Sequence, residues 1–289
     1  MEKTKIAFLG TGLMGLPMAL LLCDAGYELN VFNRTKSKTE PLAEKGSSVF
    51  DNPTVAIEGS EIIIVMLSDY SAVCSTLFKN NFRAYSKKTV IQMSTISPDE
   101  NILLKNRIED YGGSFIEAPV LGSIPQIKAG SLFVLVGADH FLFNKWQSFL
   151  KNFGEEVIHF GEVGKASSAK LALNQLIVTL TSAFSMSLGY VRNKDVDVQQ
   201  FMNVLRKSAL YAPAFDKKLE NMISRDYRNP NFPVKHLLKD VKLMNDQFGK
   251  NGIDNSILQS VIKILADTIN DGYSEYDYSA LYNTIHPED

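Results

Sequence analysis

The stretch that decides the fold is Lys5–Gly15, which reads KIAFLGTGLMG. A short apolar strand runs into the pattern Gly-x-Gly-x-x-Gly, and a helical stretch, Leu13–Ala25, follows it and stops at a glycine. In this pattern Gly10 permits a tight turn, Gly12 lets the backbone approach a pyrophosphate, and Gly15 lets the helix pack closely on the strand. We expect the pyrophosphate at the N–H groups of this turn. The residues assigned to it are Gly10, Thr11, Gly12, Leu13, Met14 and Gly15.

Apolar runs alternate with helical stretches through the first half of the chain, which predicts a doubly wound α/β domain. The predicted strands are Ile6–Leu9, Leu29–Phe32, Ile62–Leu67, Val90–Met93, Phe115–Val120 and Leu132–Val136. Several are almost continuous in Ile, Val, Leu and Phe, as strands buried on both faces should be. After that only helices are predicted, at Ala166–Val191, Val198–Lys207, Ala214–Arg225, Val234–Gly249 and Ser256–Asp271. We therefore predict a Rossmann domain at residues 1–162 and an all-α domain at residues 163–289.

The composition is that of an ordinary globular protein. Of its 289 residues, 45% are hydrophobic and 21% charged, and the net charge of −2 includes no long basic or acidic block. We therefore expect neither a nucleic-acid nor a membrane partner. Cys23 and Cys74 lie in apolar contexts, typical of small core residues rather than of a disulfide. This use of cysteine fits a reducing cytoplasm, where we expect the protein. A strand beginning near residue 4 leaves no room for a signal peptide.

Lys170 is the one charged residue in the long apolar stretch Ala166–Val191. That stretch contains seven Ser/Thr residues, which argues against a membrane span. Burying a lone ammonium costs several kcal/mol unless the group is paired or used. Asn174 follows one helical turn later on the same face. The pair indicates a catalytic site, although Lys170 could also extend to solvent from the helix end, and Asn174 could be satisfied by backbone.

The second predicted strand ends at Asn33, where an acidic residue would bind the ribose 2′-hydroxyl of NAD. Asn33 carries no charge, and Arg34, Thr35 and Lys38 follow it. A guanidinium, a hydroxyl and an ammonium suit a 2′-phosphate, so we predict NADP rather than NAD. The alternative is a solvated loop with incidental basic residues.

Two further strand ends carry candidate ligand contacts, because ligands collect beyond the carboxyl ends of strands in such sheets. Met66, Leu67 and Ser68 are expected beside the cofactor. Thr95 is expected to touch nicotinamide or substrate, unless it caps a helix. The four histidines show no metal-ligand spacing, so no metal is predicted; they are His140, His159, His236 and His286. The tyrosines near the C-terminus are expected to pack or to form a subunit contact.

Several segments resemble the β-hydroxyacid dehydrogenase family, in the family's order and over nearly the whole chain. They are Ile6–Ala19 (IAFLGTGLMGLPMA), Glu117–Ser123 (EAPVLGS) with Ala129–Leu132, Gly161–Asn174 (GEVGKASSAKLALN) and Phe232–Asp240 (FPVKHLLKD). The family includes 3-hydroxyisobutyrate dehydrogenase, tartronate semialdehyde reductase and glyoxylate/succinic semialdehyde reductase. The residues at 33–35 and 122–123 lean towards the last, NADPH-using branch.

The resemblance implies roles for individual residues. Lys170 would be the general acid in reduction and the base in the reverse reaction, and Asn174 would orient the substrate. Phe232 and Lys239 would close over the cofactor, and Asp240 would line the substrate site. Simple chemistry agrees on Lys170, because an ammonium beside a developing alkoxide stabilises the charge and supplies the proton.

The substrate loop departs from the family pattern at one position. Where the family usually has Pro-Val-Ser-Gly, Leu121 replaces the serine, whose hydroxyl would help to hold the substrate carboxylate. The N–H groups of the turn, including Gly122, or the side chain of Ser123 could compensate. Leu121 makes room for a bulkier or more apolar substrate and weakens the case for glyoxylate.

We therefore expect an NADPH-dependent reductase of a small carboxylated aldehyde or 2-oxo acid, acting as a homodimer or homotetramer. One alternative is an NAD(P)-dependent 3-hydroxyacid dehydrogenase. Another is a catalytically silent dinucleotide-binding module. Lys170 argues against an imine reductase, a class that shares the fold but commonly has another residue there.

Overall fold

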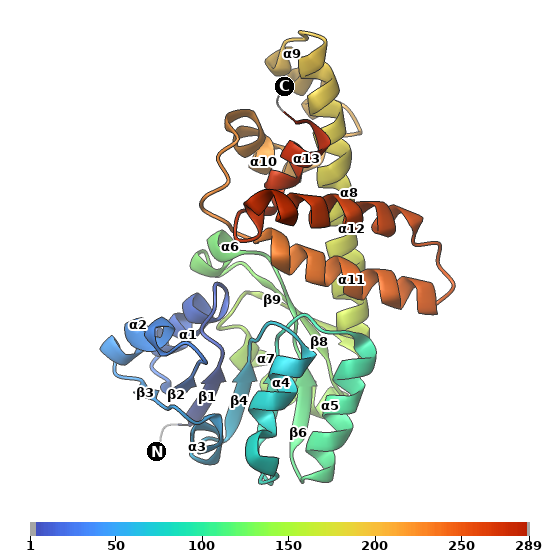
Figure 1. The fold of residues 1–289 in the computed structure, drawn as a ribbon. Coiled ribbons are helices and arrows are strands. Elements are labelled where there is room, and N and C mark those ends of the chain that lie inside the picture. Colours follow the sequence, from blue (N-terminus) through green and yellow to red (C-terminus); the bar gives the residue numbers. More distant parts are fainter. Residues whose placement is uncertain (1–3, 288–289) are drawn as a thin grey trace. The chain divides into compact units, whose positions relative to one another are not determined.

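The computed structural model describes residues 4–287 of the chain (Figure 1). It divides into two compact units, Met1–Lys170 and Leu171–Asp289. The division falls inside one unbroken helix, α8 (Lys165–Asn193). The boundary predicted from the sequence, between residues 162 and 163, falls just before this helix instead.

The first unit is built on one sheet of nine strands among its described residues. The strands are β1 (Lys5–Leu9), β2 (Glu28–Phe32), β3 (Ser48–Val49), β4 (Ile62–Val65), β5 (Thr89–Gln92), β6 (Ser114–Glu117), β7 (Val120–Leu121), β8 (Phe133–Gly137) and β9 (Glu156–Gly161). Their order is β3-β2-β1-β4-β5-β6-β8-β7, with β9 beside β8. From β3 to β6 all neighbours are parallel, whereas β8 is antiparallel to β6 and β7 and parallel to β9. Because the order runs outward from β1 in both directions, the predicted doubly wound sheet is confirmed.

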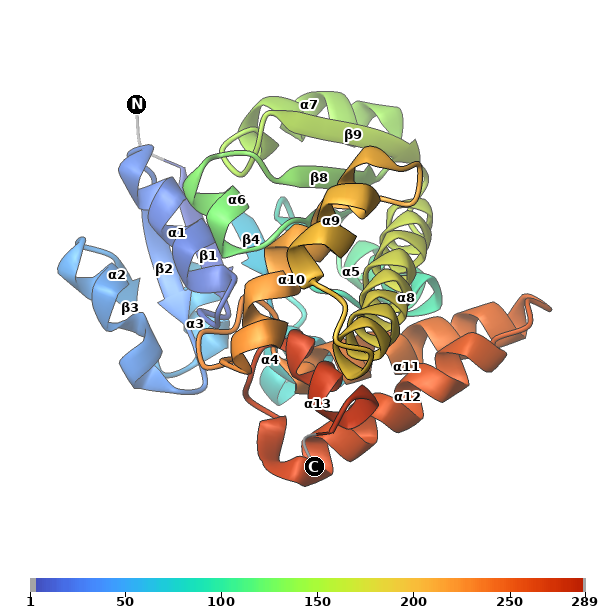
Figure 2. The same ribbon diagram turned by 90° about the horizontal axis from the view of Figure 1, so that it is seen from above.

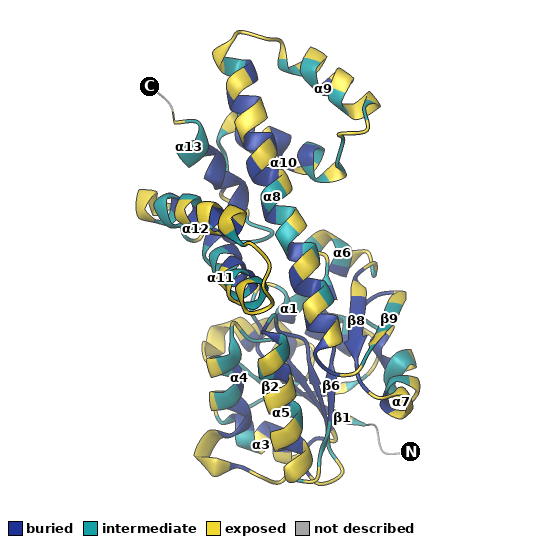
Figure 3. Ribbon diagram, turned by 90° about the vertical axis from the view of Figure 1, so that its right-hand side faces the viewer, coloured by how far each residue is buried: buried dark blue, intermediate teal, exposed yellow. Residues whose placement is uncertain are grey.

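Helices cover both faces of the sheet, so that alternate residues of the central strands β1, β4, β5 and β6 enter different cores. Ile6 and Phe8 of β1 face one core, and Ala7 and Leu9 face the other. The first core is covered by α1 (Gly15–Asp24), α2 (Glu40–Glu44), α6 (Ile124–Lys128) and α7 (His140–Leu150). The second is covered by α3 (Pro53–Glu58), α4 (Tyr70–Leu77) and α5 (Pro98–Asp110). Figure 3 shows the buried strands between helices whose outer faces are exposed.

The sequence prediction missed two strands, β3 and β9. β3 has only two residues, and β9 alternates between exposed and partly buried positions, so neither forms a long apolar run. The predicted strand Phe115–Val120 is divided into β6 and β7. Pro119 lies at the break, where its missing N–H prevents a continuous ladder. The two cysteines are free, half-buried side chains, as the prediction of small packing residues requires.

The second unit is helical, as predicted. After α8 it contains α9 (Val198–Lys207), α10 (Pro213–Ser224), α11 (Val234–Lys250), α12 (Ser256–Thr268) and α13 (Leu281–Ile285), with short turns η3 (Ile269–Tyr273) and η4 (Tyr278–Ala280) between the last two. Figures 1 and 2 show α11 and α12 lying side by side. Two hydrophobic clusters form its core, one around α11 and α12 and one around α9 and α10. The prediction missed α13, which is only five residues long.

Helix α8 is long and apolar enough to cross a membrane by length and composition, with a mean hydropathy of 1.4 over its most apolar window. Of that window, 44% is buried inside the protein. Leu171 and Val178 contribute to one core of the second unit, and Leu188 to the other. Core helices of folded proteins meet the same criterion of length and composition.

Candidate functional site

The turn after β1 has the geometry that a pyrophosphate requires. Gly10 has a φ of +104°, and a Cβ there would lie 2.2 Å from the Met66 carbonyl oxygen. A Cβ at Gly15 would lie 2.0 Å from the Gly10 carbonyl oxygen, whereas one at Gly12 would meet no atom within 4 Å. Gly10 and Gly15 are therefore needed for close packing, whereas Gly12 leaves open space. Thr11 Oγ1 is buried with no hydrogen-bond partner among residues 4–287, so it is free to serve a ligand.

Helix α1 offers its amino end to the same turn. Leu13 and Met14 lie in the turn, and Met14 is the N-cap residue without a side-chain hydrogen bond to the helix. The first turn of α1 contains no acidic residue. Its unpaired N–H groups and the positive end of the helix dipole are thus left for an anion. The strand, the turn and the helix fit a dinucleotide as the sequence predicted.

Asn33 links this turn to the loop after β2. Its Oδ1 accepts a hydrogen bond from the Thr11 N–H at 3.0 Å, and its Nδ2 donates to the Thr35 carbonyl oxygen at 2.8 Å. Arg34, Thr35 and Lys38 are exposed. Within the described part of the chain, neither Arg34 nor Lys38 forms an ion pair with a carboxylate. The loop therefore presents positive charge without an acidic side chain.

The ends of β4 and β5 are joined by a hydrogen bond, in which the Leu67 N–H donates to Ser94 Oγ at 2.8 Å. Thr95, next along the chain, is half-buried. The cap of α5 is Ser97, whose hydroxyl accepts from the Glu100 N–H while the Glu100 carboxylate accepts from the Ser97 N–H. The helix-cap alternative for Thr95 is therefore wrong, because Ser97 takes that role. Of the other predicted contacts at this edge, Met66 is half-buried and Ser68 exposed.

The loop that carries Leu121 is fixed from within. Leu121 is half-buried, and Gly122 has a φ of +135°, with a Cβ position only 2.6 Å from Leu132 Cδ2. Ser123 Oγ donates to Gln126 Oε1 at 2.8 Å, and the Ser123 N–H donates to the same oxygen at 3.0 Å. Both donors of Ser123 are thus used to begin α6. This geometry does not support Ser123 as a replacement for the missing family serine.

Lys170 lies in the second turn of α8 and is only 7% exposed. Such low exposure disfavours the alternative of a lysine that reaches solvent from the helix end. A buried ammonium is costly unless it is paired or used in the chemistry, and Lys170 remains the candidate proton donor.

In the second unit Asn174 and Asp240 lie together. Asn174 Nδ2 donates to Asp240 Oδ2 at 3.0 Å, and Asp240 Oδ1 lies 2.7 Å from Lys239 Nζ. This contact fixes the amide orientation, and Asn174 Oδ1 is left buried without a hydrogen-bond partner among the described residues. The alternative of an amide satisfied by backbone is therefore wrong. Phe232 is half-buried, with its ring edge to face against Tyr278 at 6.0 Å.

The sequence reasoning missed Glu117, which it treated only as the first residue of the substrate loop. Its carboxylate is 0% exposed and accepts hydrogen bonds from the N–H groups of Gly164 and Ser167 at 2.5 Å each. Burial raises the pKa of the Glu117 carboxyl, and these hydrogen bonds oppose the rise. The one sequence signal for Glu117 was an acidic residue at the end of a strand predicted to be buried.

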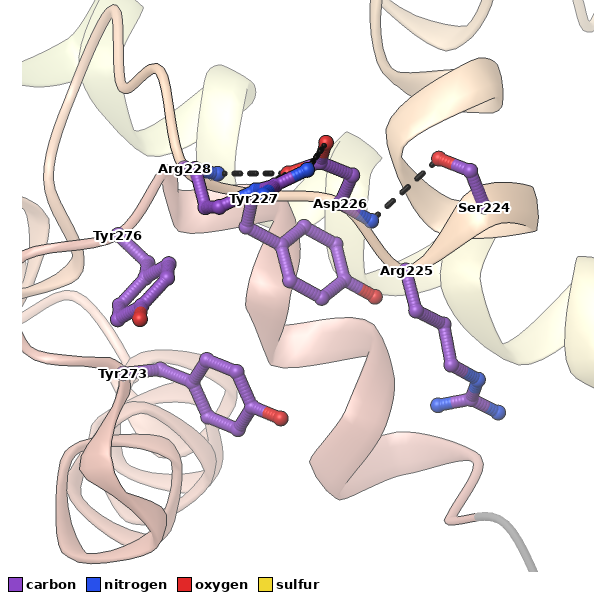
Figure 4. A pocket seen from close by; sticks show the side chains of 7 residues that line it. All are labelled: Ser224, Arg225, Asp226, Tyr227, Arg228, Tyr273 and Tyr276. Atoms are coloured by element: carbon purple, nitrogen blue, oxygen red, sulfur yellow. Dashed lines mark hydrogen bonds and ion pairs between the residues drawn. The ribbon is translucent and has the colours of Figure 1, made fainter.

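A cavity of about 300 Å³ lies elsewhere in the second unit, as Figure 4 shows. It is lined by Ser224, Arg225, Asp226, Tyr227, Arg228, Tyr273 and Tyr276. Arg228 is paired with Asp226 at 2.6 Å, and Arg225 donates to the His286 carbonyl oxygen at 2.9 Å. Two of the clustered tyrosines thus border a cavity, while Tyr278 and Tyr282 are buried, which agrees with a packing role.

Comparisons with known proteins agree with this arrangement. A family model described as the NAD-binding domain of 6-phosphogluconate dehydrogenase matches residues 5–161, more than half of the chain. A second, described as the NAD-binding part of NADP-dependent 3-hydroxyisobutyrate dehydrogenase, matches residues 164–285.

Individual relatives match over almost the full length. Glyoxylate/succinic semialdehyde reductase 2 of Arabidopsis thaliana, a chloroplastic protein, is 32% identical, over 97% of this chain and 79% of its own. Glyoxylate/succinic semialdehyde reductase 1 of the same plant is 28% identical, over 97% and 98%. The solved 3-hydroxyisobutyrate dehydrogenase of Mycobacterium tuberculosis with L-serine has the same fold, with a TM-score of 0.88 at 23% identity, over 98% and 99%. The chain therefore belongs to the β-hydroxyacid dehydrogenases, the NAD(P)-dependent oxidoreductase family of 3-hydroxyisobutyrate dehydrogenase.

Proposed function

We propose that the chain is an NADPH-dependent reductase that converts a small carboxylated aldehyde or 2-oxo acid to the hydroxy acid. The observation that carries the proposal is the buried Lys170, followed one helical turn later by Asn174 with an unpartnered oxygen. The nicotinamide dinucleotide supplies the hydride when it is bound.

The side chains account for the rest of the chemistry. Lys170 donates its proton to the substrate carbonyl oxygen, and its ammonium stabilises the negative charge that develops there. Asn174 Oδ1 accepts a hydrogen bond from the hydroxyl of the hydroxy-acid product, because its Nδ2 is already held by Asp240. Lys239 in turn balances the charge of Asp240.

Two features support NADP over NAD. The loop after β2 presents Arg34 and Lys38 in the exposed state, and Asn33 brings no negative charge to the ribose. A 2′-phosphate would bind a guanidinium, the Thr35 hydroxyl and an ammonium in such a loop. Because cells keep NADPH reduced, this preference favours reduction as the working direction.

The substrate class follows from the relatives and from Leu121. Two relatives carry the names of glyoxylate and succinic semialdehyde reductases. At Leu121, an apolar side chain takes the place of the family serine, which favours a substrate longer than glyoxylate. We therefore expect succinic semialdehyde to be reduced with a higher kcat/KM than glyoxylate.

The test is NADPH oxidation with glyoxylate, succinic semialdehyde, methylglyoxal and tartronate semialdehyde. For Lys170→Ala we expect kcat about 10²- to 10⁴-fold lower with NADPH binding retained. Lys165→Ala, which removes the exposed first lysine of the same helix, should keep full activity. Undiminished turnover in Lys170→Ala would remove the lysine from the chemistry. If hydroxy acids are oxidised faster than the aldehydes are reduced, the chain is better described as a 3-hydroxyacid dehydrogenase. If NADPH binds tightly but no substrate is turned over, the silent dinucleotide-binding module is favoured.

We also propose that the chain forms a homodimer or homotetramer through α8. One face of this helix is apolar and exposed, with residues recurring at helical spacing. These residues are Ala172, Leu176, Leu180, Ala183, Met186 and Tyr190. An apolar stripe of this length is typical of a subunit interface.

A further inference from the structure

We infer that Glu117 is a positioning residue for Lys170, because its buried carboxylate holds the amino end of the helix that carries the lysine. The inference rests on the proposed function, in which Lys170 is the proton donor. Glu117 itself is assigned no contact with substrate or cofactor.

Glu117 serves as the cap of α8 from a distant point in the chain. Its Oε2 accepts from the Gly164 N–H, and its Oε1 accepts from the Ser167 N–H, both at 2.5 Å. These donors lie 47 and 50 residues further along the sequence. The first turn of α8 has no acidic residue of its own, so this carboxylate provides the negative charge that stabilises the positive end of the helix dipole.

The groups around the carboxylate all donate to it. Besides the two N–H groups, Asn101 Nδ2 donates to Glu117 Oε1 at 3.3 Å. An ionised carboxylate can accept all three hydrogen bonds. In a protonated carboxyl, the O–H would point at one of these N–H groups, and two donors would then oppose each other. The site therefore suits a negative charge, despite the burial that raises the pKa of the group.

Glu117 is held in place by a chain of buried amides. Asn101 Oδ1 accepts from Gln92 Nε2 at 3.1 Å, and Gln92 Oε1 accepts from the Ser94 N–H at 2.5 Å. Gln92 and Glu117 are register partners at the ends of β5 and β6. This series of hydrogen bonds connects the carboxylate that caps α8 to the strand ends where cofactor and substrate contacts are expected.

The opposite side of the carboxylate is kept clear by a glycine. A Cβ at Gly137 would lie 2.3 Å from Glu117 Oε2. Gly137 has no positive φ, so its backbone conformation alone does not require glycine. The missing side chain therefore makes room for the Glu117 carboxylate.

The link to Lys170 is short and rigid. Ser167, whose N–H is bound, and Lys170 are three residues apart in α8 and share one helix face. Releasing the Ser167 N–H loosens the turn that carries the lysine. A misplacement of about 1 Å in a proton donor can cost about 100-fold in rate.

Glu117→Gln tests the role with almost no change in volume. Its amide nitrogen must face at least one of the bound N–H groups, so the cap is broken. We expect kcat to fall about 10- to 100-fold, with KM for the aldehyde and Kd for NADPH within about twofold. Because a loss of folded protein alone would also lower the apparent kcat without changing KM, kcat is calculated per folded site, counted by NADPH titration. Gly137→Ala, which pushes a methyl group against the carboxylate, should act in the same direction.

Tyr85→Phe is the matched control. Tyr85 is also fully buried in the first unit, and its hydroxyl donates to the Leu77 carbonyl oxygen at 2.5 Å. The change is again nearly isosteric and again removes a buried hydrogen bond, but far along the chain from α8. We expect a lower Tm for this variant with kcat unchanged.

Hydrogen exchange of the segment 162–172 gives a second readout that needs no turnover. We expect faster exchange there in Glu117→Gln and Gly137→Ala, and wild-type exchange in Tyr85→Phe. Unchanged exchange in Glu117→Gln overturns the inference, and so does an unchanged kcat. If the wild type reduces no aldehyde, the proposed function fails, while faster exchange confined to the two variants still supports the anchoring of α8 by Glu117.

Discussion

At the scale of single residues, Asn33 joins the turn after β1 to the loop after β2. Its amide accepts from the Thr11 N–H and donates to the Thr35 carbonyl oxygen. An aspartate there would keep the first bond but would face the Thr35 carbonyl with a second acceptor. If the chain prefers NADP as we propose, an aspartate at this position would change the nucleotide preference only if the loop moved as well.

Arg34→Ala should weaken NADPH binding about 10- to 100-fold, because a hydrogen bond to a charged group contributes about 1.5–3 kcal/mol. Binding of NADH, which has no 2′-phosphate, should change little. Fluorescence titration with both nucleotides measures the difference. Lys36→Ala is the control, because that ammonium is already paired with Asp51 at 2.8 Å. Equal losses for NADPH and NADH would rule out a 2′-phosphate contact at Arg34.

Leu121→Ser should raise kcat/KM for glyoxylate and other short carboxylated aldehydes, because a hydroxyl in this half-buried position can hold a carboxylate. We expect kcat/KM to rise about 10-fold, because one hydrogen bond to a charged group contributes at least about 1.5 kcal/mol. Leu121→Ala opens the same space without a hydroxyl and serves as the comparison. Should both variants give the same kcat/KM, the hydroxyl has no part in substrate recognition.

The residues that the sequence could predict are those with a local signal. Gly10 and Gly15 belong to one short pattern, and the positive φ of Gly10 and the close packing at Gly15 are compatible with the roles predicted for them. Glu117 has no such signal, because its partners lie 47 and 50 residues away. The bond between Ser123 and Gln126 had no such signal either, since it depends on where α6 begins.

At the scale of elements, the second unit contains a buried ion pair. Lys218 of α10 lies 2.8 Å from Asp277, which immediately precedes η4. Both side chains are almost fully buried, and Asp277 also accepts from the N–H groups of Asn231 and Ser279. The pair therefore joins α10 to the loops before α11 and α13.

Asp277→Asn should lower the free energy of unfolding by about 3–5 kcal/mol, because it leaves the Lys218 ammonium buried without its charge partner. Urea denaturation followed by circular dichroism measures the loss. The control is Arg206→Ala, which breaks a pair with Asp216 whose side chains are 36% and 34% exposed and should cost about 1 kcal/mol or less. A similar small loss in both variants would contradict the importance of burial.

Prediction of elements succeeded where apolar runs were long and failed where they were short. The strands β1, β4 and β5 and the helices α8 and α11 were expected close to their observed bounds. The two-residue strands β3 and β7 form because neighbouring strands supply hydrogen bonds, which a single-sequence pattern cannot report.

At the scale of the whole molecule, the exposed apolar face of α8 is the surface that a partner copy would cover. Met186 is 64% exposed and Tyr190 67%, although both side chains are large and mostly apolar. We expect Met186→Lys to yield a smaller particle by light scattering after size-exclusion chromatography, because a buried interface does not accept an unpaired charge. Phe141→Lys, at an apolar residue of α7 that is 76% exposed, should leave the mass unchanged. An unaltered mass for Met186→Lys would place the subunit contact elsewhere.

The long sequence separation of the Glu117 contacts also has a consequence for the order of folding. The carboxylate sits at the end of β6, yet its partners Gly164 and Ser167 come after β7, β8 and β9. Closing so long a loop is slow compared with forming a helix, so we expect α8 to acquire its fixed start only after the sheet has assembled. Until then the nascent chain would carry an uncapped helix and an acid without partners. Hydride-transfer competence would therefore appear late, as one of the last properties of the folding chain.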